Sequence, residues 1–317
     1  MKRLLSALGL AALLATTLPG TPAHAAAPVT TIKPAELPRG ADVAGPHLVG
    51  KVIVDGDRRV RAPGRAPWLH GASGDGYIVS ARSAGRWHLY RVGDGATKVL
   101  HTGGYPEYAV LSDDGAKVAL TLSQTSRRTV VKVISATTGA KIRRKAWAKA
   151  PRVLDIDGNR AVVGGPDGGY LWNLRTGRSR VIDTGFVYEA DLGANRLASF
   201  DKDPYDGGCS SVSTLLGPEE LFTIDCTEAV RAFSDDGARM ITVHKLSDGI
   251  GPNLVRERTV EGKRLATYKV GFFFGEIRWE TDTAVLLDAY GKRKGATVRC
   301  TEGTCERASS LRATPAA

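Results

Sequence analysis

Motifs of the common enzyme classes are missing from this chain of 317 residues. It contains no H-E-x-x-H zinc motif, no G-x-S-x-G nucleophile motif and no complete G-x-x-x-x-G-K-[ST] phosphate-binding loop. None of its histidines are paired at the spacing of metal ligands, and lone histidines in strands are usually structural. The sequence therefore favours a non-enzymatic binding or scaffold protein.

Long hydrophobic runs are also scarce, because the single one lies at the N-terminus. Lys2 and Arg3 precede an apolar stretch from Leu4 to Leu18, and Ala23-His24-Ala25 offers the small residues of a cleavage site. The stretch is short for a retained membrane anchor, which is the alternative. We predict a signal peptide over residues 1–25 and a secreted, extracytoplasmic chain.

Acidic residues are fewer than basic ones, and the formal net charge is +11, of which the leader supplies +2. A basic exported protein favours anionic surfaces, so the expected partners are a protein or an anionic envelope polymer, with peripheral envelope contact. Nucleic acid is not expected, because the chain is exported. The alternative is that dispersed Lys and Arg only keep a monomer soluble.

One short sequence motif occurs twice in the chain. "VLSDDGAKVALTL" begins at Val110, and "AFSDDGARMITV" begins at Ala232. A turn of this kind recurs at intervals of about 35 to 45 residues, which is the sequence sign of a propeller array. The turn positions are Gly76, Gly115, Gly158, Gly193, Gly237 and, without glycine, Asp282.

Each unit is expected to hold four short strands. In the second full unit these run over residues 107–111, 117–122, 129–135 and 141–147. The segment "TVVKVIS" (129–135) is the expected third strand. Aspartate and glycine suit the intervening turn, because they tolerate positive φ.

"LWNLRTG" (171–177) resembles the third strand and turn of WD40-like repeats. "SDDGAKVA" and "SDDGARMI" resemble the first hairpin of those repeats and of TolB-type bacterial propellers. The resemblance covers nearly the whole chain after the leader. It implies an all-β fold, a single β-propeller of four-stranded antiparallel blades over residues 47–310.

The number of blades follows from the first units. Residues 55–76 align without a gap to residues 94–115, so residues 47–61 supply strands three and four of an additional unit. We predict seven blades with one incomplete, and six blades with an added hairpin as the alternative. Residues 26–46, rich in Ala, Pro and Thr, are expected to be a flexible linker, and residues 311–317 a disordered tail.

The four cysteines form two local pairs, which in an exported chain suggests disulfides. Cys209 and Cys226 fall on strands three and four of the fourth full unit. Cys300 and Cys305 flank a Glu302-Gly303 turn, which would place them opposite each other in a hairpin. We predict the disulfides Cys209–Cys226 and Cys300–Cys305.

The resemblance to propellers places binding on the face with the loops that enter strand one and link strands two and three. Each first strand begins with a large or charged residue that could ring the channel mouth. These candidate binding residues are Trp68, Glu107, Arg152, Glu189, Arg231 and Glu276. The alternative is a solvated, salt-bridged rim.

An acidic loop and a basic outer strand are two further features that could bind ions or charged surfaces. Asp201, Asp203 and Asp206 lie in one loop and have the oxygen ligands that Ca²⁺ prefers, although their spacing is not that of an EF-hand. No cofactor is otherwise expected. The basic run Lys141–Lys149 lies on an outer strand and could contact an anionic surface or simply protect a solvated edge.

Two functions remain open. The first is a non-enzymatic binding or scaffold module acting through the channel-mouth face. The second is a metal-dependent propeller enzyme, similar to a lactonase or a lyase, with inward carboxylates in the central channel.

Overall fold

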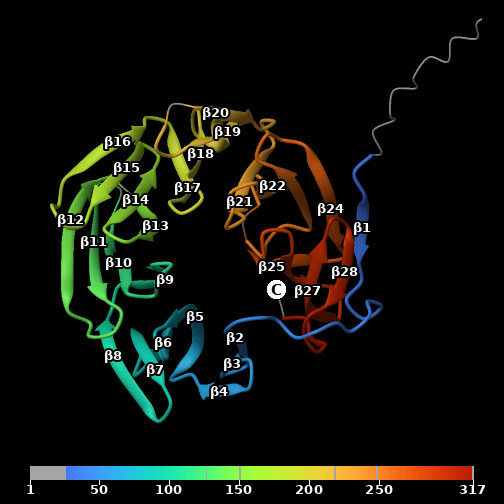
Figure 1. Cartoon of the computed structure of the whole chain (residues 1–317), viewed down its shortest axis with the longest axis horizontal. Coiled ribbons are helices and arrows are strands. Elements are labelled where there is room, and N and C mark those ends of the chain that lie inside the picture. Colours follow the sequence, from blue (N-terminus) through green and yellow to red (C-terminus); the bar gives the residue numbers. More distant parts are fainter. Residues whose placement is uncertain (1–25, 126, 150, 218, 248, 316–317) are drawn as a thin grey trace, which may run out of the picture.

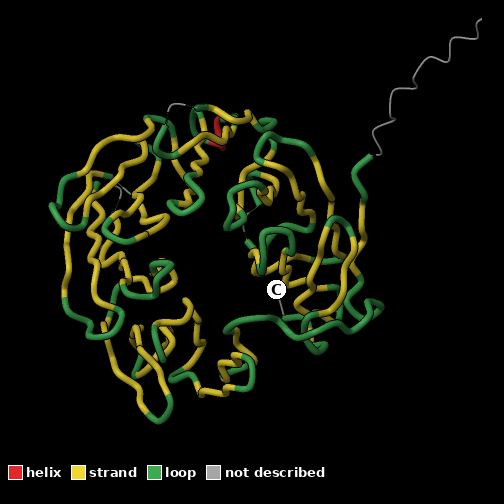
Figure 2. Tube along the Cα trace, in the orientation of Figure 1, coloured by secondary structure: helices red, strands yellow, loops and turns green. Residues whose placement is uncertain are grey.

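The computed structural model describes residues 26–125, 127–149, 151–217, 219–247 and 249–315. The predicted signal peptide (1–25) lies outside these residues. Within them the chain forms strands and a single 3₁₀ turn, Pro204–Asp206 (Figure 2). No helix of the described residues is long and apolar enough to cross a membrane.

Seven antiparallel sheets stand around a central channel as the blades of a β-propeller (Figure 1). We number the blades in chain order, and in each the strands follow one another from the channel to the rim. Blade 1 contains β2 (His47–Val49), β3 (Val52–Asp55) and β4 (Arg58–Arg61). Blade 2 contains β5 (Arg65–Ser73), β6 (Gly76–Ser83), β7 (Arg86–Gly93) and β8 (Ala96–Thr102). Blade 3 contains β9 (Tyr105–Leu111), β10 (Lys117–Gln124), β11 (Arg128–Ser135) and β12 (Lys141–Ala148).

The remaining blades have the same four-stranded order. Blade 4 contains β13 (Arg152–Asp157), β14 (Arg160–Gly165), β15 (Gly168–Asn173) and β16 (Ser179–Asp183). Blade 5 contains β17 (Phe186–Asp191), β18 (Arg196–Phe200), β19 (Ser210–Thr214) and β20 (Glu220–Thr223). Blade 6 contains β21 (Glu228–Phe233), β22 (Arg239–His244), β23 (Leu254–Thr259) and β24 (Arg264–Val270). Blade 7 contains β25 (Phe273–Trp279), β26 (Val285–Tyr290), β27 (Lys294–Thr301) and β28 (Thr304–Arg307).

The prediction of seven blades with one incomplete is confirmed, and the alternative of six is wrong. The expected strands of the second full unit are β9 to β12, within a few residues at each end. Blade 1 holds three strands rather than the two expected, because residues 47–61 fold into β2, β3 and β4.

The core lies between the blades. The second strands are buried on both faces, because a neighbouring blade covers each face, and they are therefore apolar along their length. In β6 the six residues from Gly76 to Ala81 are all buried, and in β14 the five from Ala161 to Gly165. Trp172, Tyr77 and Tyr268 are among the largest fully buried side chains.

The segment expected to be a flexible linker is instead partly a strand. β1 (Val29–Ile32) pairs in parallel with β24 at the rim of blade 6, and Ile32 is buried in the core between blades 6 and 7. Val29, two threonines and Ile32 are β-branched residues that favour strands, a signal that the surrounding Pro and Ala obscured. The expected tail is also partly ordered, since β29 (Arg312–Ala313) pairs with β27.

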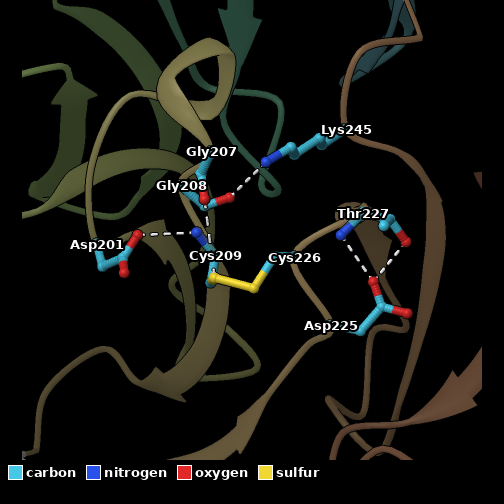
Figure 3. Close-up of a disulfide and its surroundings, with 8 residues drawn as sticks. All are labelled: Asp201, Gly207, Gly208, Cys209, Asp225, Cys226, Thr227 and Lys245. Atoms are coloured by element: carbon cyan, nitrogen blue, oxygen red, sulfur yellow. Dashed lines mark hydrogen bonds between the residues drawn. A yellow bond between two sulfur atoms is a disulfide. The ribbon is translucent and has the colours of Figure 1, made fainter.

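Both predicted disulfides are present, and Figure 3 shows the one between Cys209 and Cys226. Cys209 and Cys226 lie just outside β19 and β20 rather than on them, and they join the two ends of that hairpin. Cys300 on β27 and Cys305 on β28 are directly opposed in the ladder, as the two-residue turn predicted.

Candidate binding site at the channel mouth

The first strand of every complete blade is irregular where it lines the channel. The register between the first and second strands shifts in each of the six complete blades. In blade 6 the shift leaves Arg231 as an extra residue between Val230 and Ala232. Such bulges bend a strand and redirect a side chain, which is how a repetitive fold can present different groups at one opening.

A groove of about 730 Å³ opens at the channel mouth, and we call it the mouth groove. Its walls come from β5, β21, β25 and β26, from the loop between β22 and β23, and from Pro315. Trp68 is 54% exposed and Ile250 in the loop is 48% exposed, so the groove has apolar surface. Arg231 and Glu276, both exposed, add one charge of each sign.

A second hollow of about 360 Å³ continues from the mouth groove toward blade 1, and we call it the slot. The two share Trp68, Glu276, Asp288 and Tyr290. The slot lies between β25 of blade 7 and β5 of blade 2, with β2 at its base. Together they form one elongated surface that reaches across several blades.

Charged side chains of blade 7 line the slot in pairs. Arg312 lies 2.9 Å from a carboxylate oxygen of Asp288 and donates a hydrogen bond of 2.9 Å to the Tyr290 hydroxyl. Arg278 Nε lies 3.5 Å from Glu276 Oε1. These groups are therefore held in place before any ligand arrives.

His70, on the opposite wall of the slot, is neutral at pH 7. Burial lowers the pKa of its imidazole to about 4, and its Nε2 lies 2.6 Å from Ser80 Oγ. The β5 side of the slot is accordingly less charged than the blade 7 side.

Three of the six predicted mouth residues, Trp68, Arg231 and Glu276, line the mouth groove. Arg152 and Glu189 lie on the neighbouring inner strands β13 and β17, where Arg152 donates to the carbonyl of Tyr188 at 2.9 Å. Glu107 lies on β9, and its side chain is outside the described part of the structure.

Glu189 is the most perturbed carboxyl of the channel. Burial raises the pKa of Glu189 to about 7, although Arg152 and Arg231 nearby favour its charged form. Asp155 and Asp191 raise the pKa of Glu189 further, and burial raises the pKa of both these aspartates too. The channel interior is thus a place where carboxylates repel one another.

Comparison with known proteins identifies the architecture. No protein-family model and no curated protein matches the chain. Among solved structures, the propeller domain of the Trilobed protease from Pyrococcus furiosus, with an open velcro topology, matches with a TM-score of 0.59. That match has 11% identity and covers 85% of this chain and 98% of that one. The fold is that of a WD40-like β-propeller.

Two other structures agree. A chain of the Mitotic Checkpoint Complex has a TM-score of 0.55 at 14% identity, covering 86% of this chain and 88% of that one. An oligogalacturonate lyase in complex with manganese has a TM-score of 0.50 at 12% identity, covering 84% and 86%. The resemblance to WD40-like and TolB-type repeats is confirmed for the fold, and at these identities for the fold alone.

The acidic loop of the propeller is built by its own hydrogen bonds. The Asp201 carboxylate accepts a bond of 2.8 Å from the Cys209 amide, beside the disulfide, and Asp203 caps the 3₁₀ turn that contains Asp206 (Figure 3 shows Asp201). Lys245 Nζ, a lining residue of the mouth groove, donates to the Gly208 carbonyl at 2.7 Å. Among the described residues, no three His, Cys, Asp or Glu residues are grouped to hold a metal ion.

The basic run on β12 is largely engaged with blade 4. Arg143 Nε donates to the Leu174 carbonyl at 2.8 Å, and Lys145 Nζ donates to Ser179 Oγ at 2.6 Å. Lys145 also lies 4.2 Å from the centre of the Trp147 ring, and Lys149 pairs with Asp167. Arg143, Lys145 and Lys149 therefore contact blade 4, whereas Lys141 and Arg144 are exposed to solvent.

Sequence reasoning missed several groups of the elongated surface. Arg312 belongs to a segment expected to be disordered. Asp288 and Tyr290 lie on a strand whose sequence resembles that of any other core strand. The slot itself was not predicted, because it lies where a strand is absent and no residue of the sequence marks that position.

Proposed function

We propose that this propeller is a non-enzymatic binding module that holds a protein partner in the mouth groove. The observation that carries the proposal is Trp68, whose large ring is 54% exposed beside Arg231 and Glu276. Exposed tryptophan and arginine at the centre of a concave surface are the residues that dominate protein interfaces. Three different inner strands contribute these side chains, so a partner would contact several blades at once.

We further propose that the protein works as a monomer outside the cytoplasm, at the cell envelope or in the secreted space. The leader-like N-terminus and two disulfides support this location. Cleavage after Ala25 would leave β1 intact. The basic charge of the chain favours a partner with acidic groups, either a protein or an anionic envelope polymer.

The metal-dependent alternative has less support. Asp201 and Asp203 accept hydrogen bonds from their own loop. Glu189 and Glu276 lie in the channel wall on strands of different blades. We therefore propose binding rather than catalysis as the function, and calcium at the acidic loop has no specific observation in its favour.

The test is quantitative capture from envelope extract on the immobilised protein. Trp68→Ala and Arg231→Ala should each weaken capture of the main partner about 5- to 100-fold, equivalent to about 1–3 kcal/mol. Lys141→Ala with Arg144→Ala, exposed positions on the basic outer strand, is the matched control and should leave capture unchanged. Arg143 and Lys145 are unsuitable for this control, because they join blades 3 and 4.

The opposite pattern is equally informative. Capture that depends on Lys141 and Arg144 but not on Trp68 would show that the rim binds an anionic polymer and that the mouth groove is only a solvated opening.

A further inference from the structure

Blade 1 lacks one strand, and its place is known from the repeat. β3 and β4 correspond to the third and fourth strands of the other blades, because residues 55–76 align with residues 94–115. β2 then corresponds to a second strand, and Figure 1 shows it as the strand of blade 1 nearest the channel. The first strand, present in the six other blades, is missing.

The slot occupies the position of this missing strand. Its walls are His47 and Leu48 of β2, the Pro67–Gly71 stretch of β5, and the face of blade 7 that carries Arg278 and Asp288. In a complete blade, the first strand pairs with the second and packs between the inner strands of the two neighbours. The slot has these three surfaces already assembled.

The inner edge of β2 is free to form hydrogen bonds. No strand or bridge among the described residues pairs with it. The two-residue turn Gly50-Lys51 makes Val49 and Val52 the closing pair of the hairpin, so these residues exchange hydrogen bonds with each other. By the alternation of an antiparallel ladder, Leu48 then directs its N–H and C=O toward the slot.

No described segment of the chain is available to fill the slot. Residues 29–32 pair with β24, and residues 312–313 pair with β27. The occupant therefore comes from outside the described residues, and we infer that it belongs to another molecule. A narrow space beside an unpaired strand edge suits an extended peptide, which gains main-chain hydrogen bonds by joining the sheet.

Charge further defines the occupant. In the slot itself Arg278 and Arg312 pair with Glu276 and Asp288. The adjoining mouth groove adds Arg231 and Lys245, so the joined surface has four positive side chains against two carboxylates. Leu48, Leu69 and Trp68 supply apolar surface on the other side. An extended segment with alternating apolar and acidic residues matches both walls, since alternate side chains of a strand point to opposite faces.

We propose that an extended, acidic segment of a partner protein adds to β2 as the missing first strand and completes blade 1. This inference rests on the function proposed above and specifies how the partner is held. A segment of three or four residues at about 3.3 Å per residue matches the three residues of β2.

The experiment supplies such a strand in the same chain. The sequence of β17, Phe186–Asp191, is an inner strand of a complete blade and carries two acidic residues. A second copy of this hexapeptide is appended after Ala317 through ten Gly/Ser residues, a linker of about 17 Å average span. Pro315, the last described residue, lines the mouth groove, which adjoins the slot. The control extension carries proline at two alternate positions of the hexapeptide, which removes the N–H donors of a strand.

The expected result has three parts. The strand extension should slow amide exchange in β2 about 10-fold and raise Tm by about 2–4 °C, as for an added interaction of modest strength. It should also reduce partner capture about 10-fold, because the slot is then occupied. The proline extension should do none of these.

Each of the other possible results contradicts a specific part of the inference or of the proposed function. Equal exchange in β2 for both extensions overturns strand addition. If Trp68→Ala still weakens capture in that case, the proposed function stands without strand addition. Protection of β2 with undiminished capture means that the slot accepts a strand but the partner binds elsewhere, which also overturns the inference. If the strand extension protects β2 and reduces capture, but Trp68→Ala captures the partner fully, only the proposed role of Trp68 is contradicted.

Discussion

At the scale of single residues, Glu189 connects the channel to the pH dependence of stability. Its pKa is about 7 in the folded protein against an ordinary 4.5, chiefly because it is buried. Between these two values the folded chain binds more protons than the unfolded chain, so the contribution of Glu189 to stability falls as pH rises from about 4.5 to 7. Glu189→Gln removes this titration and keeps the shape of the side chain.

We therefore expect Glu189→Gln to match the wild type in free energy of unfolding near pH 4.5 and to exceed it by about 1 kcal/mol at pH 8. The figure is modest because Arg152 and Arg231, which favour the charged form of Glu189, lose a partner in the variant. Urea titrations at several pH values measure the difference. Parallel stability curves for the two proteins would contradict the assignment.

At the scale of elements, the repeated Ser-Asp-Asp-Gly phrase builds one turn twice. In blade 3, Ser112 Oγ donates to Asp114 at 2.5 Å, and the Lys117 amide donates to Ser112 Oγ at 2.9 Å. In blade 6, Ser234, Asp236 and Arg239 form the same two bonds at 2.6 and 2.9 Å. The serine and the second aspartate are therefore fixed by the turn rather than by a ligand.

The glycine of this turn is also a contact between blades. Gly115 has φ +65°, and a Cβ added there would lie 2.5 Å from the Ala72 carbonyl oxygen in blade 2. Gly158 has a similar φ of +52° but has no such neighbour within 4 Å. We expect Gly158→Ala to cost about 1 kcal/mol through φ alone, and Gly115→Ala about 2 kcal/mol more, because backbone must move. Thermal unfolding of both variants tests this, and equal costs would show that the two blades separate easily.

These elements also explain what the sequence could predict. The hairpin turns, the apolar second strands and the cysteine pairs are local patterns, so the blades and disulfides followed from them. β1 and β29 are short strands that exist only because a strand that does not follow them directly in the chain pairs with them, and their residues carry little local signal. Trp68, Arg231 and Glu276 were predicted as mouth residues, but Arg312 and the slot depend on the closed ring and were missed.

At the scale of the whole molecule, the ring closes without a blade shared between the two ends of the chain. Residues 29–46, which we call the strap, run along the outside of blades 6 and 7 before entering blade 1 (Figure 1). β1 pairs with β24, Arg39 bridges Arg307, and Arg299 of β27 donates to the carbonyls of Ala41 and Asp42 at 3.2 and 3.0 Å. The strap therefore links three consecutive blades at the point where the ring would otherwise open.

Substitution of Ile32 measures how much the strap contributes to the stability of the ring. Its side chain is 1% exposed and packs in the core that blades 6 and 7 share, whereas Val29 on the same strand is 61% exposed. Ile32→Ala should lower the free energy of unfolding by about 2–4 kcal/mol, and Val29→Ala by less than about 0.5 kcal/mol. Because the strap continues into β2, Ile32→Ala should also speed amide exchange in blade 1, which Ile32 does not contact. Faster exchange confined to β1 and β24 would mean that the strap is only an added edge strand. The core that blades 1 and 2 share, with the contacts of Arg58 to Tyr77 and Asp94, would then hold blade 1 in place without the strap.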